Sequence, residues 1–149
     1  MVDLKRMRYL IRRYPMACLR AEQARIRAQK LTRTISDAPR GGGSMNSTEE
    51  GLLYRIEALE RKKAIWDELC RMREELSPII DALEVQAKKR FAETDDEKRA
   101  RRDMLEVQCM RMRYLEGRSA REISYNLAYS EQHVFRVIGN AERKIQSAE

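Results

Sequence analysis

Apolar residues recur at helical spacing along most of the chain, beginning near the N-terminus. The first stripe, typical of a short amphipathic helix with flanking arginines, consists of Leu4, Met7, Ile11 and Tyr14. Because proline lacks the N–H that a helix interior uses, Pro15 is predicted to end or kink this helix. A second helix is predicted over residues 16–35, where small side chains would admit another helix at close range. Its seam positions are Ala17, Ala21, Ala24, Ala28, Leu31 and Ile35.

The helical pattern is interrupted at residues 37–46, where a proline and three glycines predict a connector. Ser47–Glu50 has the sequence of a capping box, so a long helix is predicted to begin at Ser47. Within this helix, Pro78 predicts a kink, or a restart with Ser77 as the cap.

A coiled-coil-like repeat with a phase slip near Lys62 and Lys63 occupies the segment 47–93. The repeat either packs against residues 16–35 of its own chain or pairs with another copy. We expect an oligomer, since the long apolar stripe would otherwise be exposed. Its apolar positions are Leu52, Ile56, Leu59, Ile65, Leu69, Met72, Leu76, Ile79 and Leu83. Trp66 and the methionines at 72, 104, 110 and 112 are expected in the core.

The last third, residues 94–149, is predicted to contain three helices joined by short turns. Thr94–Glu97 and Ser119–Glu122 match capping boxes, Gly117 would end the first helix, and Ser130 would cap the last. The apolar stripe of the first helix is Leu105, Cys109, Met112 and Leu115, and that of the second is Ala120, Ile123 and Leu127. The last helix turns Val134, Val137, Ile138, Ala141 and Ile145 inward.

Composition agrees with an all-α protein: the 149 residues are 37% charged and only 6% aromatic, with a net charge of +7. Residues 1–43 carry a net charge of +8, residues 44–96 carry −4 and residues 97–149 carry +3. Two basic sections separated by an acidic one favour contact with a polyanion, although basic helix faces are often only solvated. No apolar run would span a membrane, and arginines and lysines break the first 13 residues, so an intracellular, cytoplasmic protein is expected.

Catalysis is not expected from this sequence. The chain has one histidine and lacks the phosphate-loop, HExxH and GxSxG motifs. Cys18, Cys70 and Cys109 lie far apart with no CxxC spacing, so neither disulfides nor a zinc site are predicted. We therefore expect no catalytic residues, no metal and no cofactor.

Two short helices followed across tight turns by an amphipathic helix are typical of a helix-turn-helix DNA-binding module. The side of the last helix opposite its apolar stripe carries Gln132, Arg136, Gly139, Asn140 and Arg143, with His133 at the edge. Arginine pairs with guanine and glutamine or asparagine with adenine, and glycine permits close approach. Arg118 and Arg121, at the start of the preceding helix, are expected to meet phosphates.

Several of these residues have a second interpretation. Glu131 accepts from cytosine or complements the helix dipole, and His133 contacts DNA or is a surface residue that partly caps the helix. Arg143 and Lys144 near the helix end equally suit the dipole.

The segment 112–145 resembles the helix-turn-helix of sigma factor region four, and more closely the small phage late-transcription activators of the RinA and ArpU type. The residues that carry this resemblance are Arg113-Tyr114, Gly117, Glu122-Ile123, Leu127, Tyr129-Ser130, Ala141 and Lys144-Ile145. Upstream, Asp37–Ser44 followed by Glu49 is similar to the connector of those phage proteins.

The resemblance implies a phage or prophage regulator that binds double-stranded DNA upstream of late or packaging genes and acts with host RNA polymerase. It matches Ser130 to the recognition-helix cap, and Glu131, Gln132, His133 and Arg136 to the base-reading positions. The chain lacks the aromatic-rich melting helix of a complete sigma factor. Two alternatives remain: a phage small terminase subunit that binds packaging-site DNA as an oligomeric ring, and an interaction protein whose basic N-terminal helices pair with an acidic partner.

Overall fold

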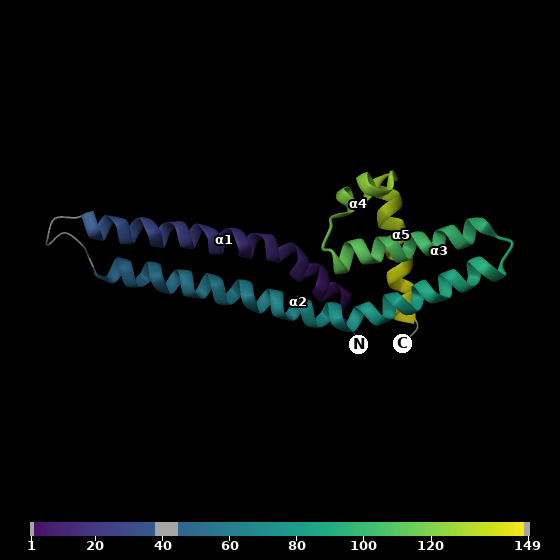
Figure 1. Cartoon of the computed structure of the whole chain (residues 1–149), viewed down its shortest axis with the longest axis horizontal. Coiled ribbons are helices and arrows are strands. Elements are labelled where there is room, and N and C mark those ends of the chain that lie inside the picture. The colour runs from purple at the N-terminus through teal and green to yellow at the C-terminus, as the bar shows by residue number, and fades with distance from the viewer. Residues whose placement is uncertain (1, 38–44, 148–149) are drawn as a thin grey trace. The chain divides into compact units, whose positions relative to one another are not determined.

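The computed structural model describes residues 2–37 and 45–147, with side chains over 2–30 and 49–147. Every regular element in these ranges is helical, so the described part of the chain is all-α (Figure 1). The elements are α1 (Leu4–Asp37), α2 (Met45–Glu93), α3 (Glu97–Met110), the π-helical segment η1 (Arg111–Leu115), α4 (Ala120–Leu127) and α5 (Glu131–Ser147). The connector predicted for 37–46 lies outside the described residues except at its ends, where α1 finishes at Asp37 and α2 begins at Met45. The long helix therefore starts before Ser47, where the capping box had placed its beginning.

Contacts divide the chain into two compact units. Residues 9–70 form one unit, which we call the hairpin unit, and residues 1–8 with 71–149 form the other, which we call the C-terminal unit. The predicted segment 94–149 lies wholly in the C-terminal unit, whereas 47–93 is divided between the two.

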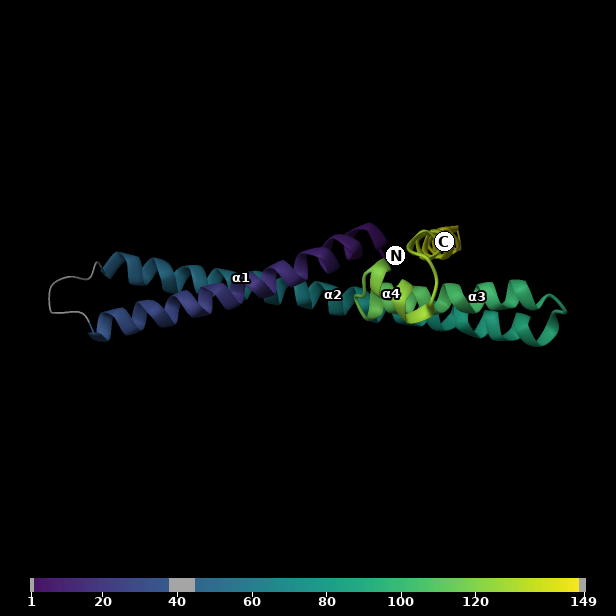
Figure 2. The ribbon, with the colours of Figure 1, turned by 90° about the horizontal axis from the view of Figure 1, so that it is seen from above.

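The hairpin unit consists of α1 and α2 running antiparallel, as Figures 1 and 2 both show. The predicted alanine seam of α1 is buried, with Ala17, Ala21, Ala24 and Ala28 at most 7% exposed. Leu31 and Ile35 lie outside the described side chains. Leu10 continues the seam toward the N-terminus, where Ile11 was expected and is only half-buried.

The seam on α2 differs from the predicted one. Its less exposed positions in this unit recur four and three residues apart at Gly51, Arg55, Ala58, Lys62, Ile65 and Leu69. The predicted positions Leu52, Ile56 and Leu59 are 45–51% exposed. Two long polar side chains occupy the true seam, because their aliphatic stems can pack beside alanines while their charges reach water. Hydrophobicity alone therefore selected the wrong row before the phase slip at Lys62 and Lys63. After the slip the prediction is right, since Leu69 and Leu76 are buried and Ile65 is half-buried.

Trp66 also departs from expectation: it is 43% exposed, and its ring stacks on Tyr14 with centroids 5.1 Å apart. Of the four methionines expected in the core, Met110 is buried and the others are half-buried.

Neither proline ends its helix, so of the predicted alternatives the helix end at Pro15 and the restart at Ser77 are wrong. α1 passes through Pro15 and α2 passes through Pro78. Both proline rings are exposed, so the carbonyl that loses its donor can be solvated. Leu10 and Ala17 are buried on either side of Pro15, and packing of one continuous row outweighs the loss of a hydrogen bond.

The C-terminal unit pairs the last part of α2 with α3, which runs back along it (Figure 2). The cap of α3 is Asp96, whose carboxylate accepts from the Arg99 N–H at 3.3 Å, and not the predicted Thr94. Thr94 instead donates its hydroxyl to the Arg90 carbonyl at the end of α2. The predicted stripe of α3 is also only partly right, since Cys109 is buried but Leu105, Met112 and Leu115 are half-buried. The buried positions are Ala100, Asp103, Glu106, Val107, Cys109, Met110 and Tyr114.

The cysteines are free thiols. Burial and the nearby carboxylate of Glu106 raise the pKa of Cys109 to about 11, so this thiol stays protonated and unreactive at neutral pH. In the described ranges, no helix is both long enough and apolar enough to cross a membrane.

Enlarging one seam alanine tests the packing of the hairpin unit. Ala24 is 1% exposed, so Ala24→Leu should lower the free energy of unfolding by about 1–3 kcal/mol through overpacking. Urea denaturation followed by circular dichroism measures this change. Gln23→Leu, at the exposed neighbouring position, is the control and should stay within about 0.5 kcal/mol of the parent. Equal effects in both variants would show that the alanine row is not packed.

Candidate nucleic-acid interface

The candidate interface is built on α4 and α5, and a widened helix end leads into it. In η1 the Glu116 N–H donates to the Arg111 carbonyl, five residues back, at 3.0 Å. Arg73 of α2 donates to the Tyr114 carbonyl at 2.9 Å, satisfying an acceptor that this helix end leaves over. Gly117 then takes a positive φ of 70° and ends the helix, as predicted.

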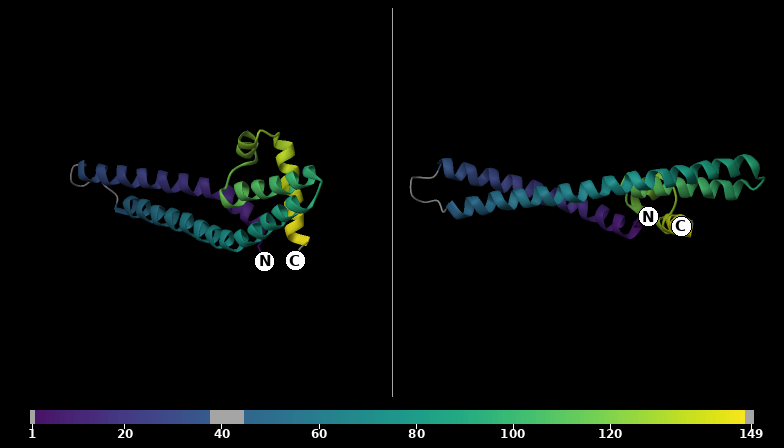
Figure 3. Two further views of the ribbon diagram at one scale, coloured as in Figure 1. Left: turned by 45° about the vertical axis from the view of Figure 1, so that its right-hand side comes forward. Right: turned by 90° about the horizontal axis from the view of Figure 1, so that it is seen from below.

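Both serine caps predicted for α4 and α5 are confirmed. Ser119 Oγ accepts from the Glu122 N–H, and Ser130 Oγ accepts from the His133 N–H, each at 3.2 Å. Between the two helices Ala128 adopts the left-handed conformation with φ 58° and ψ 39°. This conformation turns the chain in three residues and starts α5 against α4 (Figure 3).

The inner face of α5 is buried as predicted. Its five buried residues, none more than 5% exposed, are Val134, Val137, Ile138, Ala141 and Ile145. This face packs against α3, which α5 crosses in the views of Figures 1 and 3.

Glu142 attaches the middle of α5 to two other parts of the C-terminal unit. Its carboxylate accepts from the Tyr114 hydroxyl and from Arg8, whose guanidinium lies 3.3 Å away. Burial, and then the hydrogen bond and charge of Glu142, raise the pKa of Tyr114 above its usual range. The phenol therefore remains a hydrogen-bond donor over the whole physiological pH range.

Lys144 holds the end of α5. Its Nζ lies 3.1 Å from Asp103 Oδ1 and 2.6 Å from Glu106 Oε2, and both carboxylates are buried on α3. Arg90 lies 3.3 Å from the second oxygen of Asp103. Burial lowers the pKa of Lys144, but the hydrogen bonds and charges of the two carboxylates outweigh it and raise the pKa overall. Lys144 is thus a structural ion-pair partner.

The opposite face of α5 is open to solvent. Gln132, Arg136 and Arg143 are exposed, and Arg136 forms no ion pair with any described residue. Arg143 Nε donates back to the Gly139 carbonyl at 3.3 Å. A Cβ added at Gly139 would come no closer than 3.8 Å to a neighbouring atom, so internal packing does not require glycine there.

The other predicted residues are divided between this face and its edges. Glu131 is exposed, whereas the His133 ring packs on Tyr129 with centroids 4.9 Å apart, which favours the surface interpretation of His133. Asn140 is half-buried and lines a cleft toward the start of α3.

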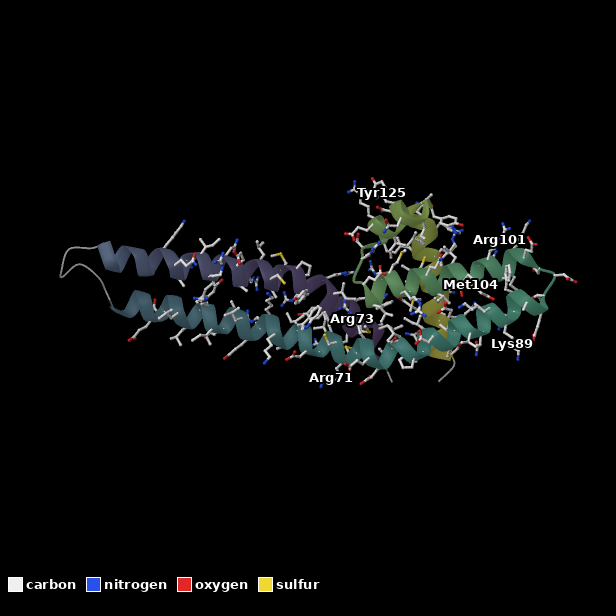
Figure 4. All side chains as sticks on the ribbon, in the orientation of Figure 1. Arg71, Arg73, Lys89, Arg101, Met104 and Tyr125 are labelled. Carbon is white, nitrogen blue, oxygen red and sulfur yellow. The ribbon has the colours of Figure 1, made fainter. Side chains whose placement is uncertain are left out.

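The two arginines expected to contact phosphates are placed differently from each other. Arg121 is exposed, with its guanidinium 6.0 Å from the ring of Tyr125, which points outward from α4 in Figure 4. Arg118 is half-buried and ion-paired to Glu116 at 2.9 Å. Arg121 is thus available to a ligand, whereas Arg118 would first have to leave Glu116.

Sequence reasoning missed a second group of cations. A cleft of about 520 Å³ brings Lys98, Arg99 and Arg102 of α3 beside Asn140 and Arg143 of α5. Its lining also includes three carboxylates, those of Asp96, Asp103 and Glu106. Arg143 therefore belongs both to the exposed face and to this cleft. The signal was present, because four of the five residues 98–102 are basic.

Phe135 was also missed, although it is 55% exposed on the helix that carries Arg136. A phenylalanine at such a position can contact thymine methyl groups. Three aromatic side chains, Tyr125, Tyr129 and Phe135, are exposed around the α4–α5 turn.

No protein-family model, curated protein or solved structure matches this chain. The chemistry of the site must therefore be argued from its own residues. Among the described residues, no group of three or more histidine, cysteine, aspartate or glutamate side chains is placed to hold a metal ion.

Gly139 allows a test in which stability and binding change in opposite directions. Since glycine weakens a helix interior and the site has room for a methyl group, Gly139→Ala should raise the free energy of unfolding by about 0.5–1 kcal/mol. If a ligand approaches the backbone here, the more stable variant will bind it more weakly. Chemical denaturation measures the free energy of unfolding, and titration with duplex DNA measures the affinity. Gln146→Ala, on the same helix, is the control. Unchanged binding would remove Gly139 from the interface.

Proposed function

We propose that this chain is a sequence-specific DNA-binding activator of transcription, with the helix that begins at Ser130 entering the major groove. One observation carries the proposal: α5 buries one whole face and presents Gln132, Arg136 and Arg143 on the other. The short preceding helix, the three-residue turn and the serine cap support a helix-turn-helix interpretation of α3 to α5. The glycine on the open face supports close approach of a ligand backbone.

Exposure and charge support two different roles for the cations of this interface, base reading and phosphate binding. Arg136 has an exposed guanidinium at the centre of this face, without an ion pair to any described residue, and is assigned to a guanine. Arg121 and the cleft residues Lys98, Arg99 and Arg102 are assigned to phosphates, which position the module without reading its sequence. Phe135 adds an apolar contact for thymine.

The biological setting is proposed from the resemblance of residues 112–145. We place the protein in the cytoplasm of a bacterial host, at late or packaging genes of a phage or prophage, where it acts with host RNA polymerase. The long helices would supply an oligomer contact. This proposal assigns the chain no enzymatic activity.

Two arginine substitutions test base reading against phosphate binding. Sequences selected from random duplex DNA supply the specific site, and a scrambled duplex supplies the reference. Arg136→Ala should lose about 1–3 kcal/mol of discrimination at one base position, whereas Arg121→Ala should weaken binding to both duplexes alike. Titrations at several salt concentrations measure affinity and salt dependence.

Matched variants sharpen this comparison. Arg136→Lys keeps the charge but cannot pair bidentately, so it should lose discrimination while retaining the salt slope. Arg71→Ala removes an exposed arginine of α2 and should change neither quantity. If Arg136→Ala and Arg121→Ala weakened all duplexes equally, the base-reading role of Arg136 would be wrong. Absence of DNA binding at low salt would reject the whole proposal.

The exposed apolar row of α2 is compatible with a second function, that of a phage small terminase subunit. Both the activator and the terminase subunit would use this row to form an oligomer. Leu52, Ile56 and Leu59 are about half exposed at heptad spacing, which suits pairing with a second copy. Light scattering on the full chain should give a dimer for the activator, whereas a ring of many subunits would favour the packaging protein.

Ile56→Asp should shift that dimer to monomer, because the substitution places a charge in the apolar contact. Ala64→Asp, an exposed position of α2 outside the row, is the control and should leave the dimer intact. A monomeric parent chain would contradict the oligomer contact but not the DNA interface.

A further inference from the structure

A groove runs along one side of the hairpin unit, between α1 and α2. Its main recess, of about 450 Å³, is lined by Arg13, Met16 and Arg20 of α1 and by Tyr54, Arg61 and Ile65 of α2. A second recess contains Arg27 and Ile26, and Tyr54 lines both, so the two recesses adjoin. None of these residues belongs to the candidate DNA interface.

The groove carries a net positive charge, because five basic side chains and one acidic side chain, that of Glu57, line its two recesses. Arg13, Arg20 and Arg27 stand seven residues apart on α1, which places them in one row about 10.5 Å apart. None of the three is ion-paired to a described carboxylate. On another side of the same helix, Arg25 is bound by Glu22 at 2.6 Å, so the arginines along the groove differ from their neighbour in lacking an acidic partner.

Apolar side chains are exposed beside this arginine row. Met16, Ile26 and Tyr54 are 41–50% exposed, although each is large and hydrophobic. Tyr9 and Tyr54 could each stack on a base. Met16 and Ile26 have no face for stacking, however, and phosphates gain nothing from apolar contacts. A groove that alternates apolar contacts with a seven-residue cationic repeat therefore favours a helix over a nucleic acid.

We propose that this groove binds an acidic amphipathic helix of a partner protein. The apolar positions of that helix would contact Met16, Ile26 and Tyr54 and complete a three-helix arrangement with α1 and α2. Its glutamates or aspartates, recurring every seven residues, would pair with Arg13, Arg20 and Arg27. The proposal is independent of DNA binding, since it rests on the hairpin unit alone.

A designed peptide provides the probe. It has about 28 residues in four heptads, with leucines at the two seam positions and glutamates flanking them. Fluorescence anisotropy of the labelled peptide with the full-length chain should show saturable binding at physiological salt. A scrambled peptide of identical composition, which keeps the charge but loses the apolar stripe, should bind at least about tenfold more weakly.

Charge reversal identifies the groove as the site. The double variant Arg20→Glu, Arg27→Glu should lose about tenfold or more in affinity for the acidic peptide. A peptide with lysines in place of the glutamates should bind this variant better than it binds the parent chain. The double variant Arg12→Glu, Lys63→Glu makes the same charge change at exposed positions of the hairpin unit outside the groove lining and should have a much smaller effect.

Three outcomes would overturn the proposal. Equal affinity for the designed peptide and the scrambled peptide would show that the groove is only a non-specific cationic surface. Tighter binding of a single-stranded RNA oligonucleotide, lost in the same double variant, would make the groove a nucleic-acid site. Failure of the lysine peptide to restore binding to a variant that still folds by circular dichroism would place the site elsewhere.

The DNA proposal and this one fail separately. Arg136→Ala should leave peptide binding unchanged, and the groove variant should leave sequence discrimination on duplex DNA unchanged.

Discussion

Two carboxylates buried on α3 must be balanced by cations, and the construction of the C-terminal unit depends on this balance. Asp103 and Glu106 are 7% and 6% exposed, so leaving either without a partner would cost several kcal/mol. Lys144 meets both from α5, and Arg90 meets Asp103 from α2. A shift of either helix along α3 would separate these charges, so the ion pairs select one register among those that apolar packing alone would tolerate.

The same balance determines what α5 can offer to a ligand. Lys144 is used internally and Glu142 is held by Tyr114 and Arg8, so these charges point into the unit. What remains exposed is a strip with Gln132, Arg136 and Arg143 around a glycine that internal packing does not need. The buried side of α5 and its exposed polar side thus lie opposite one another, and exposed residues can be altered with limited effect on the packing.

Two rows of side chains on α2 could cover the alanines of α1 in the hairpin unit, and the less apolar row does so. The alanines of α1 are covered by a row of α2 that includes Arg55 and Lys62, while the larger Leu52, Ile56 and Leu59 remain outside. Small side chains leave room for the aliphatic stems of arginine and lysine, whose charges still reach water. As a result the helix pair exposes two distinct surfaces, an apolar row on α2 and a groove of net positive charge beside α1.

The parts of this structure that depend on residues within one turn of each other could be predicted from the sequence. The caps at Ser119 and Ser130, the end at Gly117, the alanine seam and the five inward residues of α5 are as predicted, because the hydrogen bonds and spacing that define them are local. Asp96 caps α3 in place of Thr94, because the Thr94 hydroxyl donates to the Arg90 carbonyl at the end of α2.

Longer-range features were decided by the tertiary structure. Which row of α2 is buried, the continuity of both helices through Pro15 and Pro78, and the internal role of Lys144 all depend on what packs opposite. A sequence records how apolar or how charged each face is, but the free energy of burying a face depends on its partner. The sequence by itself therefore determined an all-α chain with a polar, cationic face on its last helix, and the tertiary structure decided which of its other faces were covered and which were left exposed.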